Sequence, residues 1–290
     1  MKDIKIIKNC REDASFRASF NELAKKVFSL DFENWYQNGY WTDRYIPYSV
    51  VVDGKVVSNV SVNLTDFEWN GERKHLIQLG TVMTDEAYRK QGYSRKIMEE
   101  IEKDYAGKVD GMYLFANDSV LDFYPKFGFT PVRQYQYVKE VSNSKEGTME
   151  NIPMPDKAAW DKIQEIIKNS KHCCIFDMVD NSQLNMFYLS QFMRENIYYS
   201  KELDIYVVAE IEGEELQIDM IMAKEEVDID RVIDAFGENI KKVKLGFTPK
   251  QTSGFDLAEV KVDDCTLFVK GEALKGFEEA QIMFPVLAHA

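Results

Sequence analysis

Two tight turns constrain most strongly what this chain can fold into. Asp53-Gly54 and Asn70-Gly71 each lie between runs rich in β-branched and other apolar residues. Such dipeptides are typical of the two-residue turns that join the strands of a β-hairpin. Strands joined by consecutive hairpins lie antiparallel in one sheet. The sequence from residue 48 to about residue 84 therefore predicts an antiparallel meander.

Helical and strand patterns surround this meander. A short strand at residues 3–8 precedes apolar positions at helical spacing between residues 16 and 28, and residues 93–105 have one apolar and one charged face. A strand at 110–117, a short helix ending at Gly128 and a final strand at 129–141 follow. The order β, α, three to four antiparallel strands, α, β, α, β predicts a mixed α+β fold, with a mostly antiparallel sheet flanked by helices.

A polar stretch with two prolines, residues 142–156, predicts a linker. It divides the chain into a predicted first domain, residues 1–141, and a second α+β domain, residues 157–290. The second contains expected helices near 160–167 and 184–192, a hairpin at 204–223, a helix at 228–239, and strands at 241–249, 265–271 and 283–290. Its hairpin-helix-strand order is similar to that of residues 48–116, which suggests a degenerate second copy of the first domain.

The charge is unevenly distributed. The chain has 36 basic and 49 acidic side chains and a net charge of −13; residues 1–150 hold 21 basic and 23 acidic side chains, and the rest hold 15 and 26. Nucleic acids and anionic membranes recruit basic surfaces, so we expect neither as a partner. A small anionic ligand needs only a local basic pocket and is not excluded. The oligomeric state is not indicated.

Cysteine and histidine are sparse. Four irregularly spaced cysteines and three histidines predict neither a disulfide framework nor a metal site. His172-Cys173-Cys174 has no acid or Gly-rich turn beside it, so buried packing is favoured over a nucleophile. The start lacks a signal-peptide pattern and no stretch of about 18 apolar residues occurs. We therefore expect a reduced cytoplasmic protein.

The stretch from Gly80 to Met98 carries the clearest chemistry. An apolar strand leads into a short loop and then directly into a helix, with cations at Arg89, Lys90, Arg95 and Lys96. The free N–H groups and the dipole of a helix N-terminus attract anions, and Gly92 lets backbone approach phosphate oxygens closely. The pattern indicates a phosphate cradle. The alternative is an ordinary connection with a solvated basic helix start.

Two motifs here resemble those of the GCN5-related N-acetyltransferase (GNAT) family. Arg89-Lys90-Gln91-Gly92-Tyr93-Ser94 is similar to the family's Arg/Gln-x-x-Gly-x-Gly/Ala, with Ser94 in the last place. The segment from Asn117 through Phe123-Tyr124 to Gly128-Phe129 resembles its Asn…Phe-Tyr-x-x-x-Gly-Phe signature. The resemblance covers about residues 3–141 and implies a GNAT acyl-CoA N-acyltransferase fold, with acetyl-CoA as co-substrate.

The resemblance also implies roles for particular residues. Tyr124 would act as the catalytic acid that protonates the CoA sulfur, and Asn117 would hydrogen-bond the pantetheine arm. A core position beside Phe123 and Phe127 is the alternative for Tyr124. The remaining cofactor-binding positions lie on the end of the strand and in the cradle: Val82, Met83, Thr84, Arg89, Lys90, Gln91, Gly92, Tyr93 and Ser94.

The implied reaction is acetyl transfer to a primary amine of a small molecule or peptide, by direct attack in a ternary complex. The base is open: the strand before the cradle has no acid, and His75, Gln78, a water chain or an acid from the second domain are the candidates. Seven aromatic residues between Phe32 and Tyr48 either receive a cationic amine or pack in the core.

Two other functions remain open at this stage. One is a non-catalytic acyl-CoA-binding sensor or scaffold, suggested by the missing acid and by Ser94. The other is a nucleotide-binding protein, although the chain lacks the Gly-Lys-Ser/Thr of a phosphate loop. In every case we predict that the acidic second domain does not bind CoA.

Overall fold

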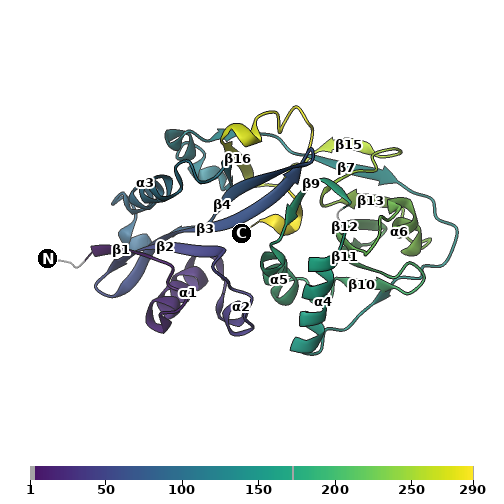
Figure 1. Ribbon diagram of the computed structural model, residues 1–290, viewed down its shortest axis with the longest axis horizontal. Helices are drawn as coiled ribbons and strands as arrows, with labels where there is room; N and C mark the ends of the chain where they lie inside the picture. The colour runs from purple at the N-terminus through teal and green to yellow at the C-terminus, as the bar shows by residue number, and fades with distance from the viewer. Residues whose placement is uncertain (1–3, 172, 290) are drawn as a thin grey trace.

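The computed structural model describes residues 4–171 and 173–289, and contains two β-sheets that lie side by side (Figure 1). The first sheet is built around the predicted meander. Its strands follow the order β1 (Ile4–Lys8), β2 (Tyr45–Val52), β3 (Lys55–Trp69), β4 (Glu72–Thr84), β5 (Gly111–Ala116), β16 (Thr266–Lys270) and β6 (Thr130–Pro131).

Both predicted hairpins are confirmed. Asp53, Gly54, Asn70 and Gly71 all have positive φ angles, between 49° and 83°, as the favoured two-residue hairpin turns require. Beyond its pairing with β2, β3 continues antiparallel to β9 (Cys174–Val179), which in turn pairs with β14 (Thr248–Pro249). The long strand β3 therefore carries segments from both halves of the chain.

Helices cover both faces of the first sheet. On one face, α3 (Tyr93–Tyr105) buries Ile97, Met98 and Ile101 against the even-numbered side chains of β5. On the other face, a cluster of buried hydrophobic side chains connects four helices: α1 (Ala14–Phe28), α2 (Glu33–Gln37), α4 (Lys157–Asn169) and α5 (Ser182–Gln191). Figure 1 shows α3 on one side of β3 and β4, and α1, α2, α4 and α5 on the opposite side.

The second sheet has the order β15 (Asp256–Glu259), β7 (Tyr135–Glu140), β13 (Lys242–Leu245), β12 (Glu215–Met222), β11 (Ile205–Glu212), β10 (Ile197–Ser200) and β8 (Glu150–Asn151). Helix α6 (Ile229–Ala235) packs Val232 and Ile233 into its core. Short 3₁₀ turns occupy Glu86–Tyr88, Asp118–Val120, Tyr124–Phe127, Glu272–Leu274 and Val286–Ala288.

Four expectations about strands and helices are wrong. Residues 241–249 do not form one strand, because β13 lies in the second sheet and β14 pairs with β9 in the first. Residues 129–141 are not one strand: β6 lies in the first sheet and β7 in the second. The short helix before Gly128 is instead two 3₁₀ turns, since Pro125 removes a backbone donor. Residues 283–289 form a turn rather than a strand, and Ala290 lies outside the described residues.

The expected strand at 265–271 exists as β16, but it pairs with β5 of the first sheet, where its alternate side chains complete the core. β7, which precedes residues 142–156, belongs to the second sheet, whereas β9, β14 and β16, which follow these residues, belong to the first. The division of the chain into domains at residues 141 and 157 stays a prediction. None of the described helices is long and apolar enough to cross a membrane.

Candidate functional site

The central strands β4 and β5 separate partway along their length. They run parallel and pair at only three positions, ending with Gln78 opposite Tyr113. Beyond this pair β4 continues to Thr84 and β5 to Ala116. The β4 edge from Leu79 to Thr84 therefore faces a widening gap rather than a paired strand. Such an edge offers backbone N–H and C=O groups to an extended ligand.

A β-bulge shapes the exposed end of β4. Thr81 and Val82 together lie opposite Val60 of β3, and Thr81 has a φ of 47°. A bulge takes its extra residue out of the ladder and bends the strand. The Asn59 side-chain amide donates to the Thr81 carbonyl at 3.0 Å and fixes this geometry. The predicted cofactor-binding positions Val82 and Thr84 are half-buried and Met83 is buried.

The predicted phosphate cradle lies where β4 ends. Gly92 is the N-cap of α3, has a φ of 77°, and gives the helix no side-chain cap. By contrast, aspartates cap α1, α4 and α6. Uncapped N–H groups at a helix start are available to a phosphate. The exposed side chains around them are those of Arg89, Lys90, Gln91, Arg95 and Lys96.

Ser94 occupies the motif position where the family has glycine or alanine. Its hydroxyl lies 3.1 Å from that of Thr84, which lies 2.8 Å from that of Ser58. This chain of hydroxyls joins the first turn of α3 to β4 and β3. The neighbouring Tyr93 is buried beneath the helix. Serine at this position therefore fixes the helix start against the strand end.

Asn117 stands at the end of β5, as the motif predicts, but its side-chain amide is engaged. It donates to the Asp264 carboxylate at 2.8 Å and to the Asp264 carbonyl at 3.2 Å. The same carboxylate accepts from the Asp118 backbone N–H at 2.6 Å. A loop from the far end of the sequence thus holds the residue expected to bind the pantetheine arm.

Tyr124 is buried on the α3 face of the sheet. Its ring packs against those of Phe123, Phe129 and Phe268, at centroid distances of 5.3–6.3 Å. Burial raises the pKa of its hydroxyl to about 12. A tyrosine that stays protonated at neutral pH has a proton to donate. Packing and a catalytic role are compatible at this position.

The opposite face of the sheet has a buried polar surface that the sequence reading missed. Asn59, Ser61 and Asn63 alternate along β3 and are almost fully buried. The Tyr45 hydroxyl lies 2.5 Å from that of Thr81. Burial, together with the nearby Cys265 and Tyr45, raises the pKa of Tyr188 of α5. The alternation of polar residues in an otherwise apolar strand was the signal available in the sequence.

Most of the aromatic segment is core. Six of its seven rings are buried, all but Tyr36. The rings of Phe32 and Trp35 pack on that of Phe187 of α5, with centroid distances of 5.1 and 5.4 Å. The Trp35 indole N–H donates a hydrogen bond to the Gln183 carbonyl at 2.9 Å. The segment therefore joins α2 to the second half of the chain.

The two candidate bases on β4 differ in position. His75 lies near the start of the strand, 61% exposed, with Nδ1 2.6 Å from Asp66 Oδ1. Gln78 is buried at the last β4–β5 pair. His75 is therefore remote from the gap, whereas Gln78 lies at its base.

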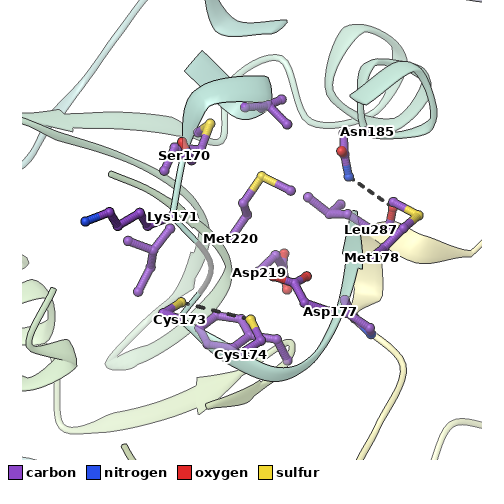
Figure 2. Close-up of a pocket in the computed structure, with 15 residues that line it drawn as sticks. Ser170, Lys171, Cys173, Cys174, Asp177, Met178, Asn185, Asp219, Met220 and Leu287 are labelled. Atoms are coloured by element: carbon purple, nitrogen blue, oxygen red, sulfur yellow. Dashed lines mark hydrogen bonds between the residues drawn. The ribbon is translucent and has the colours of Figure 1, made fainter. Parts of the chain in front are cut away.

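A second gap of the same kind occurs in the second sheet. The parallel strands β12 and β13 pair at four positions, ending with Ile218 opposite Leu245. A pocket of about 60 Å³ lies beyond this pair. Figure 2 shows Asp219 and Met220 in its middle, with Cys173 and Cys174 on one side and Asn185 on the other.

Asp219 is 3% exposed, and burial raises its pKa to about 7. It accepts a hydrogen bond from the Gln217 amide at 2.9 Å. A Cβ on Gly246 would lie 2.4 Å from its Oδ1, so glycine is required beside it. Cys173 and Cys174 lie on the pocket wall with Sγ atoms 4.0 Å apart; His172 lies outside the described residues.

Comparison with known proteins gives a consistent result. Residues 11–129 match the model of the Acetyltransferase (GNAT) family. No curated protein matches the sequence. Among solved structures, a probable N-acyltransferase from Enterococcus faecalis V583 is 17% identical with a TM-score of 0.65, covering 96% of this chain and 74% of that one.

Two further structures show the same fold. A GCN5-related N-acetyltransferase from Kribbella flavida is 15% identical with a TM-score of 0.56, over 92% of this chain and 71% of that one. A putative acetyltransferase from Pyrococcus horikoshii is 13% identical with a TM-score of 0.51, over 99% and 96%. Residues 11–129 are therefore a GNAT acetyltransferase domain, and the mixed α+β fold is that of GNAT acyltransferases. This supports an acyl-transfer function.

Proposed function

We propose that the protein transfers an acetyl group from acetyl-CoA to a primary amine of a small molecule or peptide. One observation carries the proposal: the gap between β4 and β5 leads at one end to the uncapped, basic start of α3. An extended, anionic thioester matches this arrangement. Its phosphates would meet the N–H groups behind Gly92, and its amide groups would pair with the free edge of β4.

The thioester carbon would then lie near the base of the gap, close to the bulge at Thr81. Backbone N–H groups from Val82 to Thr84 are the available donors for the oxyanion that forms during attack. The hydroxyl of Tyr124 is the available proton donor for the departing thiolate, since burial keeps it protonated. Asn117 would share its amide between Asp264 and the pantetheine arm.

The direct test is incubation of the protein with acetyl-CoA and a panel of primary amines, with the release of free thiol as the readout. We expect release that depends on the amine, and protection of the protein from heat by CoA. No heat protection by CoA at millimolar concentration, and no thiol release with any amine, would exclude the proposal.

A non-catalytic acyl-CoA-binding sensor is the second candidate, because the described part of β4 has no acid beside the gap. Substitution of Tyr124 by Phe separates the two functions. For an enzyme we expect kcat to fall about 100-fold, since the general acid is lost, while CoA affinity is unchanged. Tyr105→Phe, on the same helical cluster but at the far end of α3, is the matched control. Equal rates in both variants would remove Tyr124 from the mechanism.

A further inference from the structure

The segment at residues 286–289 lies along β5 on the face opposite α3. Three hydrogen bonds to α5, to β5 and to the loop between β13 and β14 hold it there. They are Val286 N to the Gly246 carbonyl at 2.8 Å, Asn185 Nδ2 to the Leu287 carbonyl at 3.3 Å, and the Tyr113 hydroxyl to the Ala288 carbonyl at 2.9 Å. Residues that come late in the sequence are therefore fixed against the central strand of the GNAT domain.

His289 follows this anchored turn and stacks on Phe115 of β5. The two ring centroids are 3.7 Å apart and the planes are inclined by 29°. Phe115 lies two residues beyond Tyr113, the last residue of β5 that pairs with β4. The imidazole therefore lies over the part of β5 that borders the gap.

The imidazole has an atom without a partner. Among the described residues, nothing hydrogen-bonds to the buried Nε2 of His289. A buried polar atom left unpaired destabilises the folded state, and such atoms are few in native proteins. Burial also lowers the pKa of His289 to about 4, so the ring is neutral at pH 7. A neutral imidazole accepts a proton at its free nitrogen.

The proposed acid and this imidazole lie on different sides of the sheet. Tyr124 packs with Leu114 and Ala116 on the α3 face. Phe115, on which the His289 ring stacks, packs with Tyr113 and Phe284 on the other face. Beyond Gln78 and Tyr113 the strands β4 and β5 are not paired, so the gap between them connects the two faces of the sheet. A thioester that enters from the α3 side would meet an acceptor on the His289 side.

We propose that His289 is the general base that takes the proton from the acceptor amine, an inference that rests on the proposed N-acetyl transfer. The acceptor ammonium first loses one proton to solvent, and the neutral nitrogen attacks the thioester carbon. The nitrogen becomes cationic as the C–N bond forms, and it gives a proton to Nε2. As the C–S bond breaks, the thiolate takes a proton from Tyr124. The imidazolium then releases its proton, which restores Tyr124 through solvent, so one net proton is liberated for each acetyl group transferred.

The first experiment compares His289→Gln with His75→Gln. The two variants undergo the same chemical change, but His75 is exposed and paired with Asp66 at the far end of β4. We expect kcat to fall about 100-fold or more in His289→Gln, with unchanged heat protection by CoA. His75→Gln is expected to retain the unaltered rate. A His289→Gln rate within threefold of the unaltered protein would overturn the proposal.

A purely structural role for His289 is distinguished by chemical rescue. In His289→Ala, added imidazole should restore part of the lost rate, because a small base can occupy the vacated space. Restored activity supports proton transfer. A folded variant that binds CoA, is slow, and stays slow at every imidazole concentration would assign His289 to packing instead.

If the variants do not fold, a measurement on the unaltered protein tests the role of His289. Rates with ethylamine and trifluoroethylamine, two amines of similar size and very different basicity, are measured against pH. An enzymic base predicts a loss of kcat in acid at the same pH for both amines, because kcat at saturating amine reports the ionisation of groups in the bound complex and not of the free amine. A loss of kcat that shifts fully with the basicity of the amine would overturn the proposal. No transfer of any kind by the unaltered protein would overturn both this inference and the proposed function.

Discussion

The two sheets contain the same backbone arrangement with opposite chemistry. In each, a hairpin, a helix and a strand form a parallel pair that separates after a few residues: β4 and β5 in the first, β12 and β13 in the second. The first gap ends at the uncapped Gly92, among four cations. The second leads to α6, which is only seven residues long and is capped by Asp228, next to Glu225 and Glu226. The charges and the cap at the helix start, rather than the backbone geometry, therefore predict an anion site in the first sheet and none in the second.

The largest expected effect comes from giving α3 the cap of α6. No atom lies within 4 Å of a Cβ placed on Gly92, so Gly92→Asp introduces a carboxylate without a clash, although the φ of 77° strains the backbone of any residue that has a side chain. That carboxylate would occupy the free N–H groups and repel phosphate. We expect CoA affinity to fall at least 100-fold, about 3 kcal/mol, as measured by calorimetry. Asp228→Gly is the control and should leave CoA affinity unchanged. If the Gly92→Asp variant bound CoA as tightly as the unaltered protein does, the phosphate cradle would lie elsewhere.

The second gap predicts an unusual dependence of stability on pH. Because the folded-state pKa of Asp219, about 7, lies above that of an exposed aspartate, the folded state binds the extra proton. The contribution of this carboxyl to the free energy of unfolding is therefore at its maximum below about pH 4, and it is lost as the pH rises through about 7. Asp219→Asn should remove this loss and stabilise the protein at pH 8 by roughly 2 kcal/mol, as measured by urea unfolding. A variant that loses stability equally at pH 5 and pH 8 would contradict a neutral buried carboxyl.

The smallest effect concerns the contact between Asp264 and Asn117. If the Asn117 amide binds the pantetheine arm, Asp264 competes for it. Asp264→Asn removes the charge and should tighten CoA binding about threefold, about 0.7 kcal/mol. The adjacent, exposed Asp263 provides the matched change to Asn, with no effect expected. Weaker binding of the Asp264→Asn variant would indicate that Asp264 holds Asn117 in its binding position.

Local patterns in the sequence predicted the elements between residues 45 and 105 well. Asp53-Gly54 and Asn70-Gly71 specify their hairpins through backbone preferences that need no distant contact. The apolar face of residues 93–105 likewise predicted α3 with both ends correct. The strand-loop-helix around Gly92 followed from the same short-range signals. These features depend on neighbours within a few residues.

What the sequence did not reveal depends on long-range pairing. Nothing in residues 265–271 distinguishes a strand of the second sheet from one that pairs with β5, since both need the same alternation. His289 contacts Phe115, and Tyr188 lies near Tyr45, only because the turn at 286–288 and α5 fold back onto the first sheet. Periodicity indicates what a segment forms, and not what it packs against.

The position of β16 has a consequence for how the protein is made. β5 leaves the ribosome more than 140 residues before its antiparallel partner β16, so its edge has no strand on that side through the synthesis of the whole second sheet. An unpaired apolar edge is prone to pairing with another chain. The first sheet is thus completed only after the strands of the second sheet have been synthesised, and we expect the two regions to fold in a single cooperative event rather than in two sequential ones.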